Sequence, residues 1–124
     1  MKFTLDSRTD INVIRGYGPG EVRIGELVHH APCIVTAQQL VLDWQVRDVA
    51  SLVVADLDVI FALKPDVVLL GTGARQIFPE RVIRQAFAAH RVGLEVMDLG
   101  AACRTYNILV QEERRVAAVL FPAG

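Results

Sequence analysis

The feature that most constrains the fold is a short apolar run in the middle of the chain. It extends from Asp66 to Gly71 and reads DVVLLG, with Pro65 before it and a glycine turn after it. An unbroken run of β-branched and aliphatic residues is typical of a strand that is covered on both faces. We therefore predict an α/β fold in which other elements form layers on both sides of a central sheet.

The chain after this run alternates between helical and extended patterns. Pro79 suits the first turn of a helix. The inward stripe of that helix is expected to be Val82, Ile83, Ala86 and Phe87. A second buried strand over Val92–Met97, a helix over about Ala101–Glu112 and a closing strand over Val116–Phe121 follow. Strands separated by helices favour crossover connections, so we expect mostly parallel pairing.

The first half of the chain is richer in short extended runs. Glycines and a proline at residues 16–20 separate two such runs and predict an antiparallel β-hairpin. Further strands are expected at Glu26–Val28, at Cys33–Thr36 and at Gln39–Trp44, and a short helix within Ala50–Leu63. The whole pattern predicts one domain, residues 1–124, with three layers: a central mixed, mostly parallel sheet, flanking helices and an N-terminal hairpin layer.

Composition excludes several classes of protein. Thirteen basic and fourteen acidic side chains give a net charge of -1, so the strong positive field of a nucleic-acid-binding protein is missing. The most apolar stretch, Val49–Leu63, contains Asp56 and Asp58 and is too short to insert into a membrane. The first residues do not resemble an export signal. We therefore expect a cytoplasmic protein.

Cysteine and histidine patterns point to no metal or cofactor. Cys33 and Cys103 are seventy residues apart, and a reducing compartment with two buried thiols is the simpler interpretation. The three histidines have no metal-binding spacing. Tyr17 and Trp44 either belong to an exposed recognition patch or pack in the core, as aromatic residues of sheets more often do.

One candidate site is the turn after the central strand, Gly71-Thr72-Gly73-Ala74-Arg75. Ligands of open α/β sheets bind beyond the carboxyl ends of the strands, and glycines let backbone N–H groups approach an anion. Arg75 would supply the charge. However, Gln76 stands where a dinucleotide-binding fingerprint has its third glycine. The alternative is a plain strand-to-helix turn that needs small residues.

A second cluster begins at Asp98, at the end of the next predicted strand. Adjacent parallel strands end side by side, so Asp98, Arg104 and Asn107 would approach the same crevice as the Gly71 turn. The alternative is that Asp98 simply caps the following helix. A nucleophilic Cys103 would need a base or a cation that lowers its pKa, and no histidine lies nearby in the sequence. We assign no catalytic residue.

These segments resemble a known family. The turn at Gly71–Gly73, the segment EVMD at 95–98 and the run ACRTYNIL at 102–109 are similar to the small α/β domain family that includes mitochondrial complex I assembly factor 3 and the adipogenesis-associated protein. Most bacterial members of that family are uncharacterised. The resemblance extends from about Ile11 to Phe121 and implies a three-layer fold with a mixed sheet. Leu99 departs from the threonine usual in the family.

The resemblance and the missing catalytic set together favour a non-enzymatic binding or assembly-type module. Its partners would be proteins, and respiratory-complex subunits are the ones that the resemblance implies. The alternative is an enzyme or a binder of small anionic ligands that uses the crevice near Gly71–Arg75 and Asp98–Asn107. A third hypothesis is a self-associating scaffold, since 52% of the residues are hydrophobic. We expect a monomer or a weak homo-oligomer.

Overall fold

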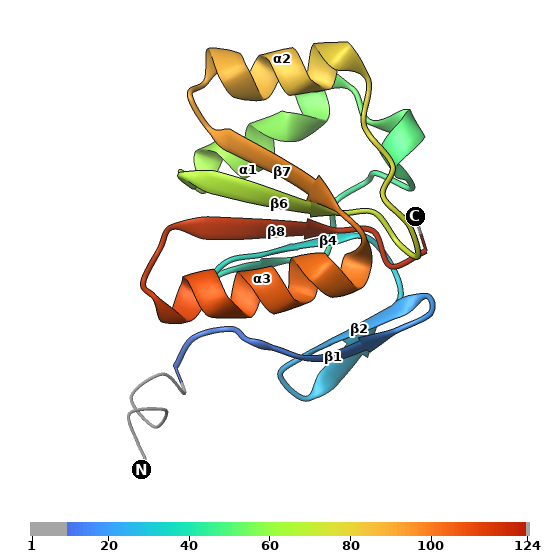
Figure 1. The fold of residues 1–124 in the computed structure, drawn as a ribbon, viewed down its shortest axis with the longest axis vertical. Helices are drawn as coiled ribbons and strands as arrows, with labels where there is room; N and C mark the ends of the chain where they lie inside the picture. Colours follow the sequence, from blue (N-terminus) through green and yellow to red (C-terminus); the bar gives the residue numbers. More distant parts are fainter. Residues whose placement is uncertain (1–9, 124) are drawn as a thin grey trace.

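Strand β8 (Val116–Leu120) lies at the centre of the molecule, and all five of its residues are buried. The computed structural model describes residues 10–123. β8 is the middle strand of a five-stranded sheet of order β5-β4-β8-β6-β7, and Figure 1 shows it between β4 and β6. The other strands are β4 (Cys33–Val35), β5 (Leu40–Val41), β6 (Val67–Gly71) and β7 (Gly93–Met97).

The sheet is mixed, as predicted. β6 pairs in parallel with both β8 and β7 over five residues each. β4 pairs antiparallel with β8 over three residues and with β5 over two, so the parallel pairings are the longer ones. The central run is β6, in which Leu69 packs into one core cluster while Val68 and Leu70 pack into the other. Its unbroken apolar pattern follows from this burial on both faces.

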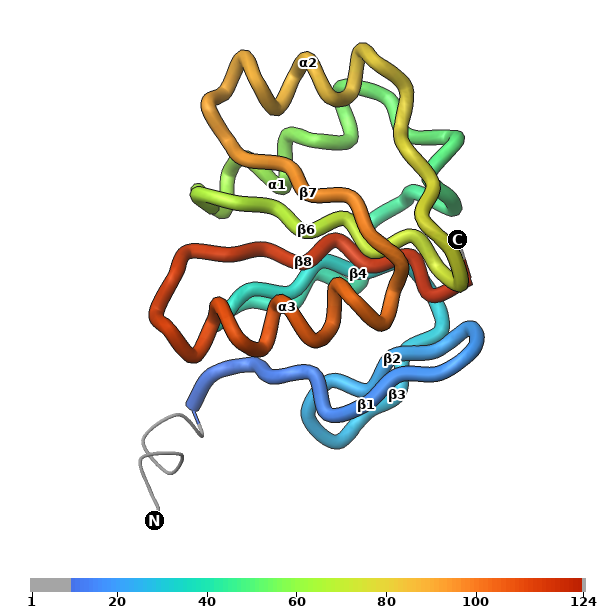
Figure 2. Tube along the Cα trace, in the orientation of Figure 1, coloured from blue at the N-terminus to red at the C-terminus, as the bar shows by residue number. Residues whose placement is uncertain are grey.

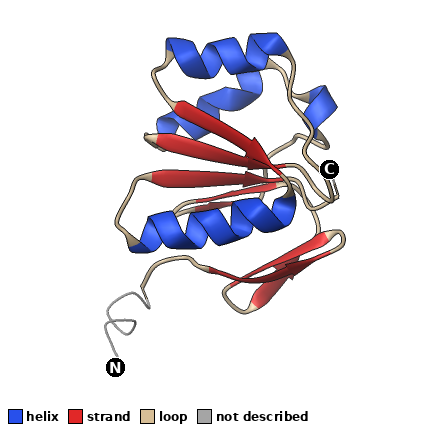
Figure 3. Cartoon of the chain, viewed as in Figure 1, coloured by secondary structure: helices blue, strands red, loops and turns tan. Residues whose placement is uncertain are grey.

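Helices cover both faces of the sheet (Figures 1 and 3). Helix α3 (Leu99–Gln111) covers one face, where Ala102, Cys103 and Tyr106 are fully buried. The other face is covered by α1 (Asp58–Ala62), α2 (Arg81–Ala89) and two 3-10 turns, η2 (Val49–Ser51) and η3 (Val54–Leu57). These layers agree with the predicted three-layer arrangement.

A second, three-stranded antiparallel sheet packs against the outer side of α3. It consists of β1 (Ile14–Gly18), β2 (Glu21–Ile24) and β3 (Leu27–His29), in that order. The predicted hairpin is β1–β2, with its turn at residues 19–20. In Figure 2 the blue trace of this sheet lies beside α3, on the side away from β8. Helix α3 is therefore held between two sheets.

The short helix predicted within Ala50–Leu63 is present, but it occupies only the last part of the segment. Only Asp58–Ala62 is α-helical, and two 3-10 turns precede it. Asp48 Oδ1 accepts the N–H of Ser51 at 2.9 Å, and Asp56 Oδ2 accepts the N–H of Val53 at 2.9 Å. Aspartate side chains that bond to nearby backbone N–H groups compete with continuous helix, and this competition divides the segment.

Two further details differ from the prediction. Val82 was placed on the inward stripe of α2, but its side chain is 50% exposed, because only Ile83 and Phe87 of this helix are buried. The strand predicted over Val92–Met97 is present, but it is the edge of the sheet and is only half-buried. A strand at an edge has one neighbour, so its burial is incomplete.

Candidate functional site

The carboxyl ends of β6 and β7 lie side by side, as the sequence predicted. Gly71 is paired with Met97, and the N–H of Thr72 donates to the carbonyl of Met97 at 2.9 Å. A further hydrogen bond connects the loop after β6 to the start of α3: the N–H of Leu99 donates to the carbonyl of Gly73 at 2.8 Å. The loop that follows β6 and the segment that follows β7 therefore lie next to each other at one end of the sheet.

An open hollow of about 650 Å³ lies at this end of the sheet. Its walls are the hairpin tip at residues 17–20, the loop at 73–74, the start of α3 with Arg104, and residues 122–123. Glycine, proline, alanine, leucine and one tyrosine make up most of this lining, and Asp98 and Arg104 are its charged residues. We call it the hairpin-tip hollow. Its composition suits an apolar ligand surface with one or two polar contacts.

Tyr17 of β1 reaches the start of α3 from the small sheet. Its ring lies so close to Gly100 that a Cβ there would come within 2.8 Å of Tyr17 Cε1. Arg104 donates a hydrogen bond from Nη1 to the Tyr17 hydroxyl, and its guanidinium carbon lies 5.9 Å from the centre of the ring. Tyr17 is still 45% exposed, so it contributes an accessible aromatic surface to the hollow.

Arg104 is the cation of the hollow. It is exposed, and the structure records no ion pair between it and any carboxylate within residues 10–123. Its recorded partner is the neutral Tyr17 hydroxyl. A guanidinium that is not held in an ion pair keeps its capacity to bind a carboxylate or another oxyanion of a ligand.

Asp98 has the structural role that the sequence allowed for. Its Oδ1 accepts the N–H of Ala101 at 2.8 Å and caps α3, which is why the helix begins at Leu99 instead of Ala101. The carboxylate also places a negative charge at the helix N-terminus, where it is favourable. An anionic ligand would have to compete with this charge.

The remaining predicted site residues do not line the hollow, except Gly73. Gly71 is buried against Ala102, and Thr72 is fully buried with its hydroxyl donating to the Arg75 carbonyl at 2.6 Å. That hydroxyl also accepts the N–H of Ile77 at 2.9 Å, so Thr72 fixes the loop. The side chain of Arg75 is exposed but outside the lining of the hollow.

Asn107 lies further along α3 and binds the backbone of β1. Its side-chain oxygen accepts the Ile14 N–H at 2.9 Å, and its amide nitrogen donates to the Ile14 carbonyl at 2.8 Å. The amide is occupied at both ends and holds the small sheet against α3. The structure thus brings together Gly73, Asp98 and Arg104 of the predicted set, and separates Arg75 and Asn107 from them.

Sequence reasoning missed most of the hairpin tip, Gly18–Gly20, and residues 122–123 as parts of this surface. The exposed-patch interpretation of Tyr17 was the available signal, since an aromatic residue beside a glycine-rich turn is well placed for recognition. Trp44, by contrast, is half-buried and its ring lies 5.7 Å from that of Phe121. The sequence could not show that the hairpin packs on α3.

Cys103 belongs to the buried face of α3 and is fully buried with Cys33 in the same core cluster. Burial raises the pKa of the Cys103 thiol to about 12 and that of Cys33 to about 11. A nucleophilic cysteine needs a lowered pKa. Both thiols therefore act as packing groups. No cluster of histidine, cysteine, aspartate or glutamate able to hold a metal ion occurs within residues 10–123.

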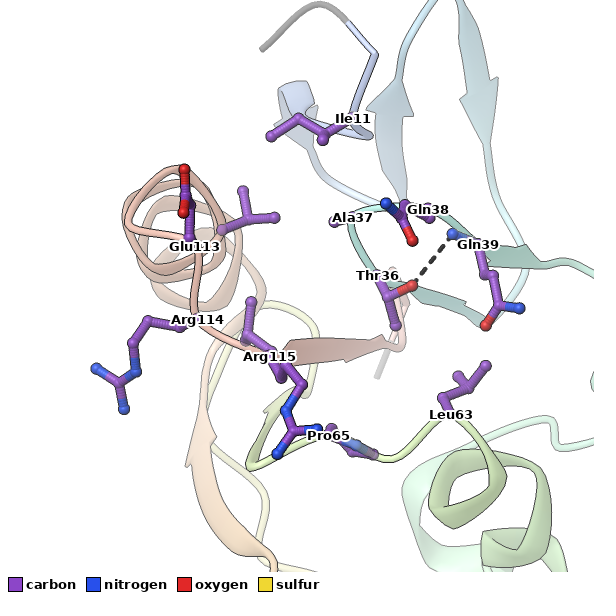
Figure 4. Close-up of a pocket in the computed structure, with 12 residues that line it drawn as sticks. Ile11, Thr36, Ala37, Gln38, Gln39, Leu63, Pro65, Glu113, Arg114 and Arg115 are labelled. Carbon is purple, nitrogen blue, oxygen red and sulfur yellow. Dashed lines mark hydrogen bonds between the residues drawn. The ribbon is translucent and has the colours of Figure 1, made fainter. Parts of the chain in front are cut away.

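A second hollow, of about 420 Å³, lies at the opposite end of the sheet, where β6 and β8 begin (Figure 4). Arg114 extends away from it, and Arg115 forms an ion pair with Asp66 at 3.0 Å. Its polar side chains do not converge on one point, and Figure 4 shows one hydrogen bond among them, from Gln39 N–H to Thr36 Oγ1 at 3.1 Å. The hairpin-tip hollow is therefore the stronger candidate.

The fold and this surface define a small mixed α/β domain with an open hollow at the carboxyl end of its parallel strands. The chain belongs to the family described as protein of unknown function DUF498/DUF598, whose model matches residues 14–121. It also resembles a solution structure from Bordetella pertussis described as a Mth938-like domain. The TM-score is 0.82 and the identity 29%, over 100% of this chain and 94% of that one.

The chain is also similar to proteins from Francisella tularensis and from zebrafish. A Francisella tularensis protein named 13 kDa major membrane protein is 37% identical over 101 residues, which is 80% of each chain. A zebrafish protein named NADH dehydrogenase [ubiquinone] 1 alpha subcomplex assembly factor 3 is 32% identical over 112 residues, or 89% of this chain. The match spans 64% of the zebrafish protein's length. Within residues 10–123, no helix has the length and apolar character needed to span a bilayer.

Proposed function

We propose that this domain is a non-enzymatic, assembly-type module that binds a segment of a partner protein in the hairpin-tip hollow. The lining of that hollow carries the proposal, because it is mostly apolar and has a single cation, Arg104, without an ion pair among residues 10–123. Such a surface suits an apolar segment that bears one carboxylate. The resemblance to an assembly factor supports the same class of function.

The lining also argues against chemistry in the hollow. It contains Asp98, Arg104 and Tyr17 but no cysteine, serine, lysine or histidine. Asp98 is occupied in capping α3. A reaction that proceeds through a nucleophile and a base requires two such groups within hydrogen-bond reach. Binding requires only shape and the arginine.

The partners that the resemblance suggests are subunits of a respiratory complex during assembly. We propose that the domain meets them in the cytoplasm, because two unpaired buried thiols suit a reducing compartment. Cell fractionation tests the location separately, since the Francisella relative is named as a membrane protein. Recovery of this protein only with membranes after a high-salt wash would contradict it.

The experiment is affinity capture of a tagged full-length chain from native extract after mild crosslinking, comparing wild type with two variants. Arg104→Ala removes the cation, and Tyr17→Ala removes the aromatic wall. Both variants are expected to reduce the recovered amount of a reproducible partner by at least about five-fold, which is the range expected for a lost charge-assisted contact. Arg23→Ala, an exposed arginine outside the hollow, is the matched control. Equal recovery with all four proteins would reject the proposal.

The second candidate is a small anionic ligand in the same hollow, favoured by the same Arg104. Phosphate, nucleotides and simple carboxylates are titrated while the backbone amides of Gly73 and Gly100 are followed by NMR. Saturable shifts that disappear in Arg104→Ala would support this alternative. Absence of shifts at millimolar concentration would eliminate these ligands.

A further inference from the structure

Strand β7 leaves a row of backbone groups facing outward at the edge of the central sheet. The N–H of Gly93 donates to the Asp66 carbonyl at 3.0 Å, and the carbonyl of Met97 accepts from Thr72 at 2.9 Å, so these residues face β6. Residues alternate in direction along a parallel strand. Leu94 and Val96 therefore direct their N–H and C=O groups away from the sheet.

One of these four outward groups has a partner. Gln76, in the loop before α2, donates from Nε2 to the Val96 carbonyl at 2.8 Å. Within residues 10–123, no contact is recorded for the outward N–H and C=O of Leu94 or for the N–H of Val96. Unpaired backbone groups at a sheet edge are available to an added strand in a complex.

A hollow with a mixed lining lies beside this edge, on the side covered by α2, and its polar lining residues are Gln76, Arg84 and Glu95. It has a volume of about 490 Å³, and Phe78, Phe87, Leu94 and Val96 contribute to its lining. Phe78 is 61% exposed at its rim. Leu94 and Val96 pack toward the core cluster on this face. A strand paired with β7 would direct alternate side chains into this hollow.

Glu95 is exposed, and the alternation of side chains along a strand places it on the face of β7 opposite Leu94 and Val96, although it also belongs to the lining of the hollow at this edge. In an antiparallel partner, the residue opposite Glu95 lies within direct side-chain contact. A basic residue there is favourable and an acidic one is unfavourable. The edge thus specifies a three-residue pattern: apolar opposite Leu94, basic opposite Glu95 and apolar opposite Val96.

A second copy of this chain does not fit that pattern. In an antiparallel pair of β7 strands, the residues whose backbone groups point outward, Leu94 and Val96, must lie opposite each other. The register that pairs all five residues of both strands then places Glu95 opposite Glu95 of the other copy. Like charges directly opposite are destabilising. This charge selects against self-association and in favour of a different protein.

We propose that the outer edge of β7 binds an extended segment of a partner protein, which joins the sheet as an added strand with an apolar–basic–apolar sequence. This surface is separate from the hairpin-tip hollow, so each proposal can fail without the other. The charge at Glu95 and the outward backbone of Leu94 and Val96 recognise the segment.

The probes are two synthetic peptides, acetyl-STIKVTS-amide and the same sequence with glutamate in place of lysine. Each is titrated to about 5 mM into the isotope-labelled full-length protein. With the lysine peptide, we expect saturable shifts and slower hydrogen exchange at the amides of Leu94 and Val96. The lysine peptide should bind about three- to ten-fold more tightly than the glutamate peptide, as a charged cross-strand pair implies.

Charge reversal provides the decisive comparison. Glu95→Lys changes an exposed residue and should reverse the order of the two peptides. The matched control Glu26→Lys makes the same change at an exposed turn and should leave the order as in wild type. Arg104→Ala should also leave it unchanged, which separates this site from the hairpin-tip hollow.

Three results would overturn the proposal. The first is the absence of shifts at Leu94 and Val96 with either peptide. The second is an unchanged order of affinities in Glu95→Lys. The third is protection of these two amides that increases with protein concentration in the absence of peptide, because it would show that a second copy occupies the edge.

Discussion

Asn107 holds Ile14 at two points, accepting its N–H at 2.9 Å and donating to its carbonyl at 2.8 Å. One side chain of α3 thereby takes the place that a neighbouring strand would take on that edge of β1. The two residues are 93 positions apart in the chain. The position of the hairpin tip, and with it one wall of the candidate site, depends on this contact.

We predict that Asn107→Asp lowers the free energy of unfolding by about 1–3 kcal/mol, because a carboxylate would face the Ile14 carbonyl without a donor. Urea unfolding measures the change. The control Ile108→Ala alters the next residue, which is 59% exposed, and should change the free energy by less than about 0.5 kcal/mol. A similar decrease in the free energy of unfolding in both variants would contradict a specific stabilising role for the contact between Asn107 and Ile14.

We predict that Gly71→Ala destabilises the fold by about 1–3 kcal/mol through overpacking. The new Cβ would lie 2.8 Å from Ala102 Cβ and 3.1 Å from Leu120 Cδ2, and neither element can move away cheaply. Gly16→Ala, where nothing lies within 4 Å of the added Cβ, is the control for thermal unfolding. Gly71 acts in packing α3 on β6, so an unchanged melting temperature in Gly71→Ala would contradict this role.

We predict that Asp98→Ala lowers stability by about 0.5–2 kcal/mol, the usual cost of losing an N-cap. Asp98→Asn retains a side-chain oxygen for the Ala101 N–H and should recover at least half of the loss. Chemical unfolding of the three proteins at pH 7 compares them. If Asp98 serves a ligand and not the helix, neither variant will differ from wild type in stability.

The buried thiols predict that stability decreases in alkaline solution. Burial raises the pKa of Cys33 from 9.0 to about 11 and that of Cys103 from 9.0 to about 12. The unfolded chain therefore loses these protons first, so stability is complete below pH 9.0 and falls as the pH rises toward the folded values. Between pH 8 and pH 10 the loss should be about 2–3 kcal/mol for the two thiols together, since each pH unit contributes about 1.4 kcal/mol per thiol at most.

Urea unfolding at pH 8, 9 and 10 measures this slope. A variant with Cys33→Ala and Cys103→Ala should show a flatter pH dependence, whatever its absolute stability. The same burial predicts that a disulfide reagent labels neither thiol in the folded protein at pH 8 and both after unfolding. One thiol that reacts rapidly in the folded state would contradict the assignment of packing roles.

Local patterns predicted the strands and helices that bury a regular face. β6 and β8 are continuous apolar runs, and the Ile83–Phe87 spacing of α2 matches one helical turn. The Ala50–Leu63 segment has the same apolar spacing but breaks into short turns, because Asp48 and Asp56 bond to local backbone N–H groups. The periodicity of apolar residues indicates which residues are buried, but it does not indicate that side chains will form hydrogen bonds with the nearby backbone and interrupt a helix.

Part of the candidate site could also be predicted from the order of the elements along the chain. Parallel pairing of neighbouring strands brought Gly73 and Asp98 to one end of the sheet, as expected from the order of elements. The sequence offered Tyr17 as an exposed residue, but its contact with Gly100 and Arg104 was not predictable, because that contact depends on how the small sheet packs on α3. Nor was the separation of Arg75 and Asn107, which depends on the directions of two exposed or half-buried side chains.

The sequence by itself determined most of the elements, the mixed α/β class and the adjacency of the two strand ends, and it offered the Asp98 cap as one of two alternatives, because each follows from contacts between residues close in the chain or from the pairing rules of strands. Only the tertiary structure decided that β7 is an open edge and that Tyr17 meets Arg104, 87 residues away. Those outcomes depend on which layers pack together. The packing energy comes from contacts throughout the molecule, so no single segment of the sequence determines it.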